Sequence, residues 1–126
     1  MTGSAKHWGK PISLSLEPTT ACNLRCPECP SGLRNFNRPT GRMNLALLDN
    51  ILADVKSYCL HINFYFQGEP YLHPQFLDMV DRCNQAGIYS AASTNAHFLN
   101  SKKAKETVES GLDRLIISID GVEQST

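Results

Sequence analysis

The sequence predicts an α/β fold, a partial (βα) barrel with parallel strands and about four strand–helix units. Short apolar runs that are typical of strands alternate along the chain with segments of helical periodicity. Such alternation is typical of a parallel sheet built from right-handed crossover units. Within the last predicted strand, residues 114–119, the run Leu115-Ile116-Ile117 is apolar without alternation, as expected of a parallel strand covered on both faces. A closed eight-stranded barrel takes about 250 residues, so we expect a truncated barrel, about half of one.

The composition is that of one ordinary globular domain. The 126 residues are 41% hydrophobic, and twelve basic and twelve acidic residues give a formal net charge of zero. This balance excludes the Lys and Arg excess of a sequence-independent nucleic-acid binder. No apolar run is long enough for a membrane span, and the first residues lack the apolar core of a signal peptide, so we expect a cytoplasmic protein. Residues 1–11 are expected to form an N-terminal tail and residues 12–126 the folded core.

The first unit is a strand followed by a long loop. Residues 12–17 alternate apolar and polar side chains with period two, which predicts a strand. Residues 19–43 are rich in Pro and Gly and have no clear periodicity. A loop of that length inside a compact domain is usually functional.

The second unit is a helix and a buried strand. Asn44 is a suitable N-cap, and apolar residues then recur at spacings of three and four, which predicts a helix that ends near Tyr58. Residues 60–66 form a short apolar and aromatic run and predict a buried strand.

Two further helix–strand units complete the prediction. Pro74 suits the first position of a helix, and Gly87 suits the C′ position that closes it. Residues 88–94 predict a third strand, residues 101–110 a third helix, and residues 114–119 a fourth strand. The inner face of the helix before Gly87 is expected to consist of Phe76, Leu77, Val80 and Cys83.

Polar side chains follow each of the four predicted strands. In parallel α/β folds, sites form where loops leave the carboxyl ends of the strands. We therefore expect these residues to meet at one edge of the sheet and to form a single site. In strand order they are Cys22, Cys26 and Cys29, then Glu69 with the adjacent Gly68, then Thr94 and Asn95, and finally Asp120.

The cysteines Cys22, Cys26 and Cys29 are the strongest chemical signal. Closely spaced cysteines in a reducing compartment are more often metal ligands than disulfides. Iron–sulfur clusters usually take four cysteines, so three suggest that a small molecule binds the fourth iron. A structural zinc ion is the alternative, and its fourth ligand would be His61, His73 or His97.

The pattern Cys-x-x-x-Cys-x-x-Cys after the first strand resembles the signature of the radical SAM superfamily. The resemblance implies that Cys22, Cys26 and Cys29 hold a 4Fe-4S cluster, whose fourth iron is chelated by S-adenosylmethionine (SAM). Gly68 and Glu69, followed by a proline, resemble the superfamily's Gly-Gly-Glu-Pro motif, which binds the SAM amino group.

The later strand ends resemble the superfamily as well. Thr94 and Asn95 resemble its polar motif near the ribose and methionine of SAM, and Ser118 and Asp120 resemble its fourth-strand motif. The resemblance therefore implies SAM contacts for all four residues.

Two residues depart from the superfamily pattern. Gln67 replaces the first glycine of the Gly-Gly-Glu-Pro motif, and Glu28 stands where an aromatic residue is usual. The resemblance implies that the main chain of Glu28 contacts adenine. The surroundings of the cysteines also resemble members with a C-terminal SPASM domain, which often modify peptides or proteins.

The function implied by the resemblance is that of a radical SAM enzyme. The reduced cluster cleaves SAM to a 5′-deoxyadenosyl radical, which abstracts hydrogen from a substrate, here expected to be a peptide or protein. An external electron donor of the flavodoxin or ferredoxin type would reduce the cluster. The competing class is an iron–sulfur electron carrier or cluster-binding module without radical chemistry.

Overall fold

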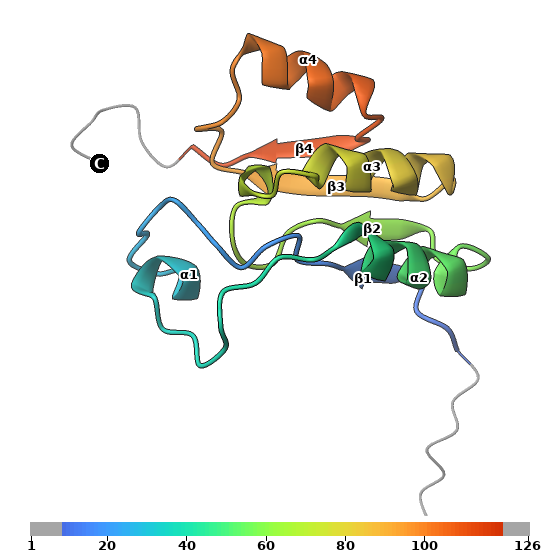
Figure 1. Ribbon diagram of the computed structural model, residues 1–126, viewed down its shortest axis with the longest axis horizontal. Helices are drawn as coiled ribbons and strands as arrows, with labels where there is room; N and C mark the ends of the chain where they lie inside the picture. The colour runs from blue at the N-terminus through green and yellow to red at the C-terminus, as the bar shows by residue number, and fades with distance from the viewer. Residues whose placement is uncertain (1–8, 120–126) are drawn as a thin grey trace, which may run out of the picture.

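The computed structural model describes residues 9–119 as a four-stranded parallel sheet with helices packed against it (Figure 1). The strand order is β1-β2-β3-β4, and every pairing is parallel, so the predicted α/β fold is confirmed. In chain order the elements are β1 (Ser13–Ser15), α1 (Pro30–Leu33), α2 (Leu45–Val55), β2 (His61–Asn63), the 3₁₀ turn η1 (Pro70–Leu72), α3 (Phe76–Gln85), β3 (Tyr89–Thr94), α4 (Ser101–Glu109) and β4 (Arg114–Ile117).

The strands are shorter than the sequence predicts, but interstrand hydrogen bonds extend past their ends. The amide of Leu16 donates to the Asn63 carbonyl at 2.8 Å, and the amide of Ser118 donates to the Thr94 carbonyl at 2.9 Å. The sheet therefore leads directly into the loops at its carboxyl edge. The short elements α1 and η1 were not predicted, and both lie in those loops.

Helix α2 begins where the sequence predicts. The Asn44 side chain accepts a hydrogen bond from the amide of Leu47 at 2.8 Å, which is the expected N-cap interaction. The helix ends at Val55 and a turn follows it, so the predicted end near Tyr58 is three residues late.

Helix α3 begins later than predicted. Pro74 does not occupy the first helical position, because the helix starts at Phe76. The His73 ring accepts a hydrogen bond from the Gln75 amide at 3.1 Å and so holds these residues in a turn ahead of the helix. At the other end, Gly87 has a φ of +70° and occupies the predicted C′ position.

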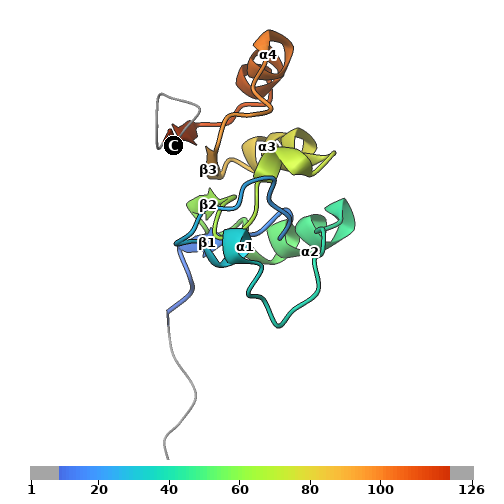
Figure 2. The ribbon, with the colours of Figure 1, turned by 90° about the vertical axis from the view of Figure 1, so that its left-hand side faces the viewer.

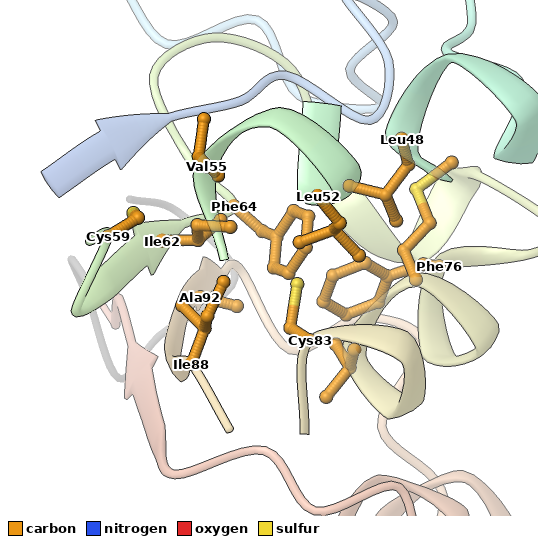
Figure 3. Close-up of a cluster of buried hydrophobic side chains, with 12 residues drawn as sticks. Leu48, Leu52, Val55, Cys59, Ile62, Phe64, Phe76, Cys83, Ile88 and Ala92 are labelled. Atoms are coloured by element: carbon orange, nitrogen blue, oxygen red, sulfur yellow. The ribbon is translucent and has the colours of Figure 1, made fainter. Parts of the chain in front are cut away.

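One hydrophobic core lies between the sheet and its helices (Figure 3). Its aromatic centre is Phe76, whose ring meets that of Phe64 edge-on at 5.8 Å. Figure 2 shows the helices on one side of the sheet, so the opposite face carries none of them. The buried core residues are Leu48, Leu52, Val55, Cys59, Ile62, Phe64, Phe76, Met79, Val80, Cys83, Ile88 and Ala92.

The fourth strand corrects one expectation. Strand β4 is not covered on both faces: none of its residues is buried, and the helices that cover the sheet lie on one side of it. Within residues 9–119 it is also an edge strand that pairs with β3 alone. Leu115 packs against the core, whereas Ile117 is 49% exposed. In this sheet, a continuous apolar run therefore belongs to a strand at the edge.

Among the helices of residues 9–119, none is long and apolar enough to cross a membrane.

Candidate cofactor site at the carboxyl edge of the sheet

The carboxylate of Glu69 is the centre of the loops at the carboxyl edge. The residue is only 2% exposed, and η1 begins directly after it. Its Oε1 accepts hydrogen bonds from the Thr94 hydroxyl at 2.7 Å and the Tyr71 amide at 3.2 Å, and its Oε2 accepts one from the Asn95 amide at 2.9 Å. The loops that follow β2 and β3 therefore meet at one buried anion, as the sequence predicts for Glu69, Thr94 and Asn95.

This carboxylate retains capacity for a further donor. An ionised carboxylate offers about four acceptor positions. The three hydrogen bonds to Glu69 use two positions on Oε1 and one on Oε2. One position on Oε2 is left, and a ligand ammonium group is a suitable donor for it.

Gly68 lets this loop pack against the segment that leads to the cysteines. Its φ is +81°, and a Cβ at this position would lie 2.1 Å from the Thr19 carbonyl oxygen and 2.9 Å from that of Ala21. The next amide, of Glu69, donates to the Ala21 carbonyl at 2.8 Å. Only glycine combines this backbone angle with so close an approach. The segment that Gly68 contacts ends at Ala21, one residue before Cys22.

The three cysteines lie on the loop between β1 and α1. Cys22, Cys26 and Cys29 are free thiols of intermediate exposure. Cys29 is the N-cap residue of α1, and its amide donates to the Cys26 carbonyl at 3.3 Å. A Cβ on Gly32 would lie 2.3 Å from the Cys26 carbonyl oxygen, so α1 packs directly behind the cysteine loop.

Asn23 joins the cysteine loop to the loop that follows β3. Its Oδ1 accepts a hydrogen bond from the Asn95 side-chain amide at 2.9 Å, and its Nδ2 lies 3.2 Å from Nδ1 of His97. On the other side, the guanidinium of Arg34 donates to the carbonyl of Cys22 at 3.3 Å. The two contacts of Asn23 link residues that lie more than seventy positions apart in the chain. The sequence alone did not indicate them.

A second link joins the cysteine loop to the loop after β2. The hydroxyl of Ser31 donates to Gln67 Oε1 at 2.8 Å and accepts from the Gly68 amide at 3.2 Å. The thiol of Cys29 donates to the same Gln67 oxygen at 3.8 Å. The sequence marked Gln67 only as a departure from the superfamily motif, and nothing in the local pattern indicated Ser31.

Three further residues were predicted to belong to the site, namely Ser118, Glu28 and Asp120. The Ser118 hydroxyl lies 3.3 Å from that of Ser93 on β3, so Ser118 lies at the same edge of the sheet. Glu28 is exposed, and its side chain has no hydrogen-bond or ion-pair partner in the part of the chain that the structure describes. Asp120 lies outside the described residues.

Asn63 is a polar residue at this end of β2 that the sequence prediction missed. Its Oδ1 is buried and has no hydrogen-bond partner within residues 9–119. Side chains alternate along a strand, and Phe64 points into the core, so Asn63 lies on the face without helices. The sequence did contain a signal for this residue, since Asn63 is a polar residue inside the apolar run of residues 60–66. This oxygen is an open acceptor for a ligand on that face.

The zinc alternative finds no support in the described residues. Nowhere in that part of the chain do three His, Cys, Asp or Glu side chains come together to hold one metal ion. His73 is engaged by the Met43 carbonyl and the Gln75 amide, while His61 starts β2, away from the carboxyl edge. A 4Fe-4S cluster takes one thiolate on each ligated iron, so its cysteines need not converge on one ion.

The loops at the carboxyl edge lie apart from the groove between α2 and α3. A groove of about 730 Å³ lies between α2 and α3, and Asp49 and Arg82 are among its lining residues. None of the loop residues described above lines it. The donor set at the edge, three accessible thiols beside a buried carboxylate with a free acceptor position, fits a cluster and a ligand with an amino group.

Known proteins are similar to this chain in both sequence and fold. A tungsten-containing aldehyde ferredoxin oxidoreductase cofactor-modifying protein of Pyrococcus furiosus is 36% identical over 109 residues, which cover 85% of this chain and 30% of the relative. A PqqA peptide cyclase of Bradyrhizobium diazoefficiens is 25% identical over 121 residues, which cover 96% of this chain and 32% of the relative. The chain thus spans about a third of the length of these curated relatives.

Solved structures agree with this relationship. The crystal structure of BtrN in complex with AdoMet and 2-DOIA superposes with a TM-score of 0.78 at 25% identity, covering 89% of this chain and 47% of that chain. The family description "Radical SAM superfamily" matches residues 16–126. On this match, which includes all three cysteines and the whole carboxyl edge, the chain belongs to the radical SAM superfamily.

Proposed function

We propose that this chain is the cofactor-binding part of a radical SAM enzyme. Members of the superfamily use a 4Fe-4S cluster and SAM. Here Cys22, Cys26 and Cys29 would hold the cluster, and the amino group of SAM would donate to Oε2 of Glu69. The observation that supports this most directly is the buried Glu69 carboxylate, which has one unused acceptor position. The backbone amide of the same residue donates to the Ala21 carbonyl, one residue before Cys22.

The cluster and SAM, when bound, supply one-electron cleavage of the sulfonium and a 5′-deoxyadenosyl radical that abstracts hydrogen. The chain supplies binding and orientation. Thr94 and Asn95 fix the Glu69 carboxylate through the hydroxyl of one and the amide of the other. Gly68 brings that carboxylate close to the cysteine loop.

Further SAM contacts extend this assignment. Ser118, at the end of β4, and Asp120 beyond it are proposed to contact SAM. The main chain of Glu28, next to Cys29, is proposed to contact adenine. Glu28 is an exposed residue, so a ligand can reach it from solvent.

The proposed substrate is a peptide or protein. Several relatives that match most of this chain at 25–27% identity are PqqA peptide cyclases. In this proposal the four strand–helix units form part of a (βα) barrel in a protein with a C-terminal SPASM domain. Its cluster receives electrons from a flavodoxin or ferredoxin, and it works in the cytoplasm, where free thiols such as these five persist.

An electron carrier without radical chemistry is the competing function. A carrier needs thiolates around its cluster but has no use for a buried carboxylate with a free acceptor position. The arrangement around Glu69 therefore favours the SAM-dependent enzyme.

The decisive experiment is anaerobic reconstitution with iron and sulfide, followed by reduction in the presence of SAM. We expect 5′-deoxyadenosine and methionine, detected by liquid chromatography and mass spectrometry. Cys26→Ala should lose the cluster absorbance, whereas Cys59→Ala, at a buried cysteine of the core, should keep it. A reconstituted protein that reduces its cluster yet leaves SAM intact would favour the electron carrier.

A further inference from the structure

Gln67 bridges the cysteine loop and the loop that follows β2. Its Oε1 lies 3.8 Å from the Cys29 sulfur and 2.8 Å from the Ser31 hydroxyl. Ser31 is buried, at 3% exposure, and its hydroxyl also accepts the Gly68 amide at 3.2 Å. The Gln67 side chain is therefore held beside one of the three proposed cluster ligands.

Cluster binding changes what Cys29 requires of this neighbour. A free thiol can donate a hydrogen bond to the Gln67 oxygen, as it does here. A thiolate bound to iron has no proton to donate and is an acceptor only. With the carboxamide in its present orientation, the oxygen of Gln67 would then face the sulfur, and two acceptors would oppose each other.

Reversal of the carboxamide removes this conflict. The oxygen and nitrogen of a Gln side chain occupy nearly equivalent positions, so a rotation by 180° exchanges them without moving the rest of the side chain. The Ser31 hydroxyl, which now donates to Oε1, must then rotate its hydrogen away and accept from Nε2 instead. Nε2 then has two hydrogens for two acceptors, the Cys29 sulfur and the Ser31 oxygen. Ser31 continues to accept the Gly68 amide, so the Gln67–Ser31–Gly68 contact persists.

We propose that Gln67 is a positioning residue that donates a side-chain N–H to the Cys29 thiolate and raises the reduction potential of the cluster. This inference rests on the proposed function, since it needs a cluster on Cys29. A hydrogen bond to a cluster sulfur stabilises the reduced, more electron-rich form, and such bonds are among the determinants of cluster potential. Gln67 thus makes the cluster easier to reduce by its electron donor.

The test is the midpoint potential of the reconstituted protein, measured without SAM by a redox titration followed by electron paramagnetic resonance. Gln67→Met keeps the length of the side chain, excludes water and removes the N–H donors. Gln67→Gly introduces the superfamily's residue and leaves room for water to donate in its place. We expect the potential to be lowest for Gln67→Met, intermediate for Gln67→Gly and highest for the wild type.

Gln75→Met is the matched control, because Gln75 is exposed and its side chain makes no capping hydrogen bond at α3. It should keep the wild-type potential. A wild-type potential in Gln67→Met would overturn the inference while leaving the proposed function intact, provided the wild type still cleaves SAM. A wild type that assembles no cluster would instead contradict the proposed function itself.

Discussion

Glu69 illustrates how individual residues shape this site. A buried carboxylate is costly unless its acceptor positions are filled. Here the Thr94 hydroxyl and the amides of Tyr71 and Asn95 fill three of them. The same contacts that stabilise the anion also join the loops after β2 and β3, so this one residue contributes both to folding and to the proposed binding of SAM.

Glu69→Gln is expected to lower the free energy of unfolding by about 2–3 kcal/mol, because one carboxylate oxygen becomes an NH₂ group that faces a donor. Urea denaturation of the protein without cofactors measures this loss. Glu109→Gln is the matched control: its ion pair with Lys105 is exposed, and the loss of that pair should cost less than about 0.5 kcal/mol. Equal losses in the two variants would contradict the role given to Glu69.

His73 predicts a pH dependence of stability. The ring is buried, its Nε2 donates to the Met43 carbonyl at 2.8 Å, and its Nδ1 accepts from the Gln75 amide at 3.1 Å. Burial lowers the pKa of His73, and the charge of Arg42 lowers it further, while the bond to Met43 partly offsets this. The folded state therefore binds a proton less readily than the unfolded state.

Because the pKa of His73 is lowered on folding, its contribution to stability is present at neutral pH and is lost as the pH falls below about 6.5, the value for an unfolded histidine. We expect the urea midpoint of the wild type to fall between pH 7.5 and pH 5.5. His73→Gln, which does not titrate, should show a smaller fall. His97→Gln, at an exposed position, should behave as the wild type. A fall of the same size in His73→Gln would refute the assignment.

At the scale of elements, the loops at the carboxyl edge depend on close backbone contacts rather than on a hydrophobic core. Helix α1 packs on the cysteine loop through Gly32, and the loop after β2 packs through Gly68 on residues 19–21, which lead to the cysteines. Both contacts bring backbone atoms within distances that a Cβ would occupy. The geometry of the cysteine loop is therefore set by its neighbours as well as by its own residues.

Gly68→Ala and Gly87→Ala separate backbone conformation from packing. Both glycines have positive φ, +81° and +70°, so each alanine should cost about 1 kcal/mol for the conformation alone. Only Gly68 has a neighbour in the way, the Thr19 carbonyl at 2.1 Å, which should add about 1–3 kcal/mol. Urea denaturation compares the two, and similar losses would show that the contact with Thr19 is not tight.

At the scale of the whole molecule, the described chain is an open sheet with an apolar edge. Strand β4 pairs with β3 alone among residues 9–119, and Ile117 and Ile119 at its end are 49% and 72% exposed. An exposed, apolar strand edge favours pairing between chains. Poor solubility of the isolated chain is therefore the expected behaviour.

Ile117→Lys should reduce self-association of the isolated chain, because a charge on an edge strand disfavours edge-to-edge pairing. Sedimentation velocity at several protein concentrations measures the effect. Val108→Lys, on the exposed surface of α4, is the control for added charge and should have little effect. If both variants dissociate the chain equally, general charge rather than the β4 edge governs association.

Much of this architecture was predictable from local patterns. The N-cap at Asn44 and the C′ glycine at Gly87 follow from the chemistry of helix ends, and both are observed. The meeting of Glu69 with Thr94 and Asn95 follows from the parallel strand order, since the carboxyl ends of such strands lie at one edge. The prediction that α3 starts at Pro74 was wrong. The Gln75 amide donates a hydrogen bond to the His73 ring, and this contact overrides the usual preference of proline for the first helical position.

The sequence by itself determined the parallel α/β arrangement, because periodicity is a local property. It also predicted a metal- or cluster-binding role for Cys22, Cys26 and Cys29 from their spacing, which is local as well. Only the tertiary structure decided that Asn23 meets Asn95 and that Gln67 meets Ser31, pairs that lie 72 and 36 residues apart. It also decided that β4 is not covered on both faces, since none of its residues is buried. Such contacts depend on how whole loops pack against one another, and no local pattern encodes that packing.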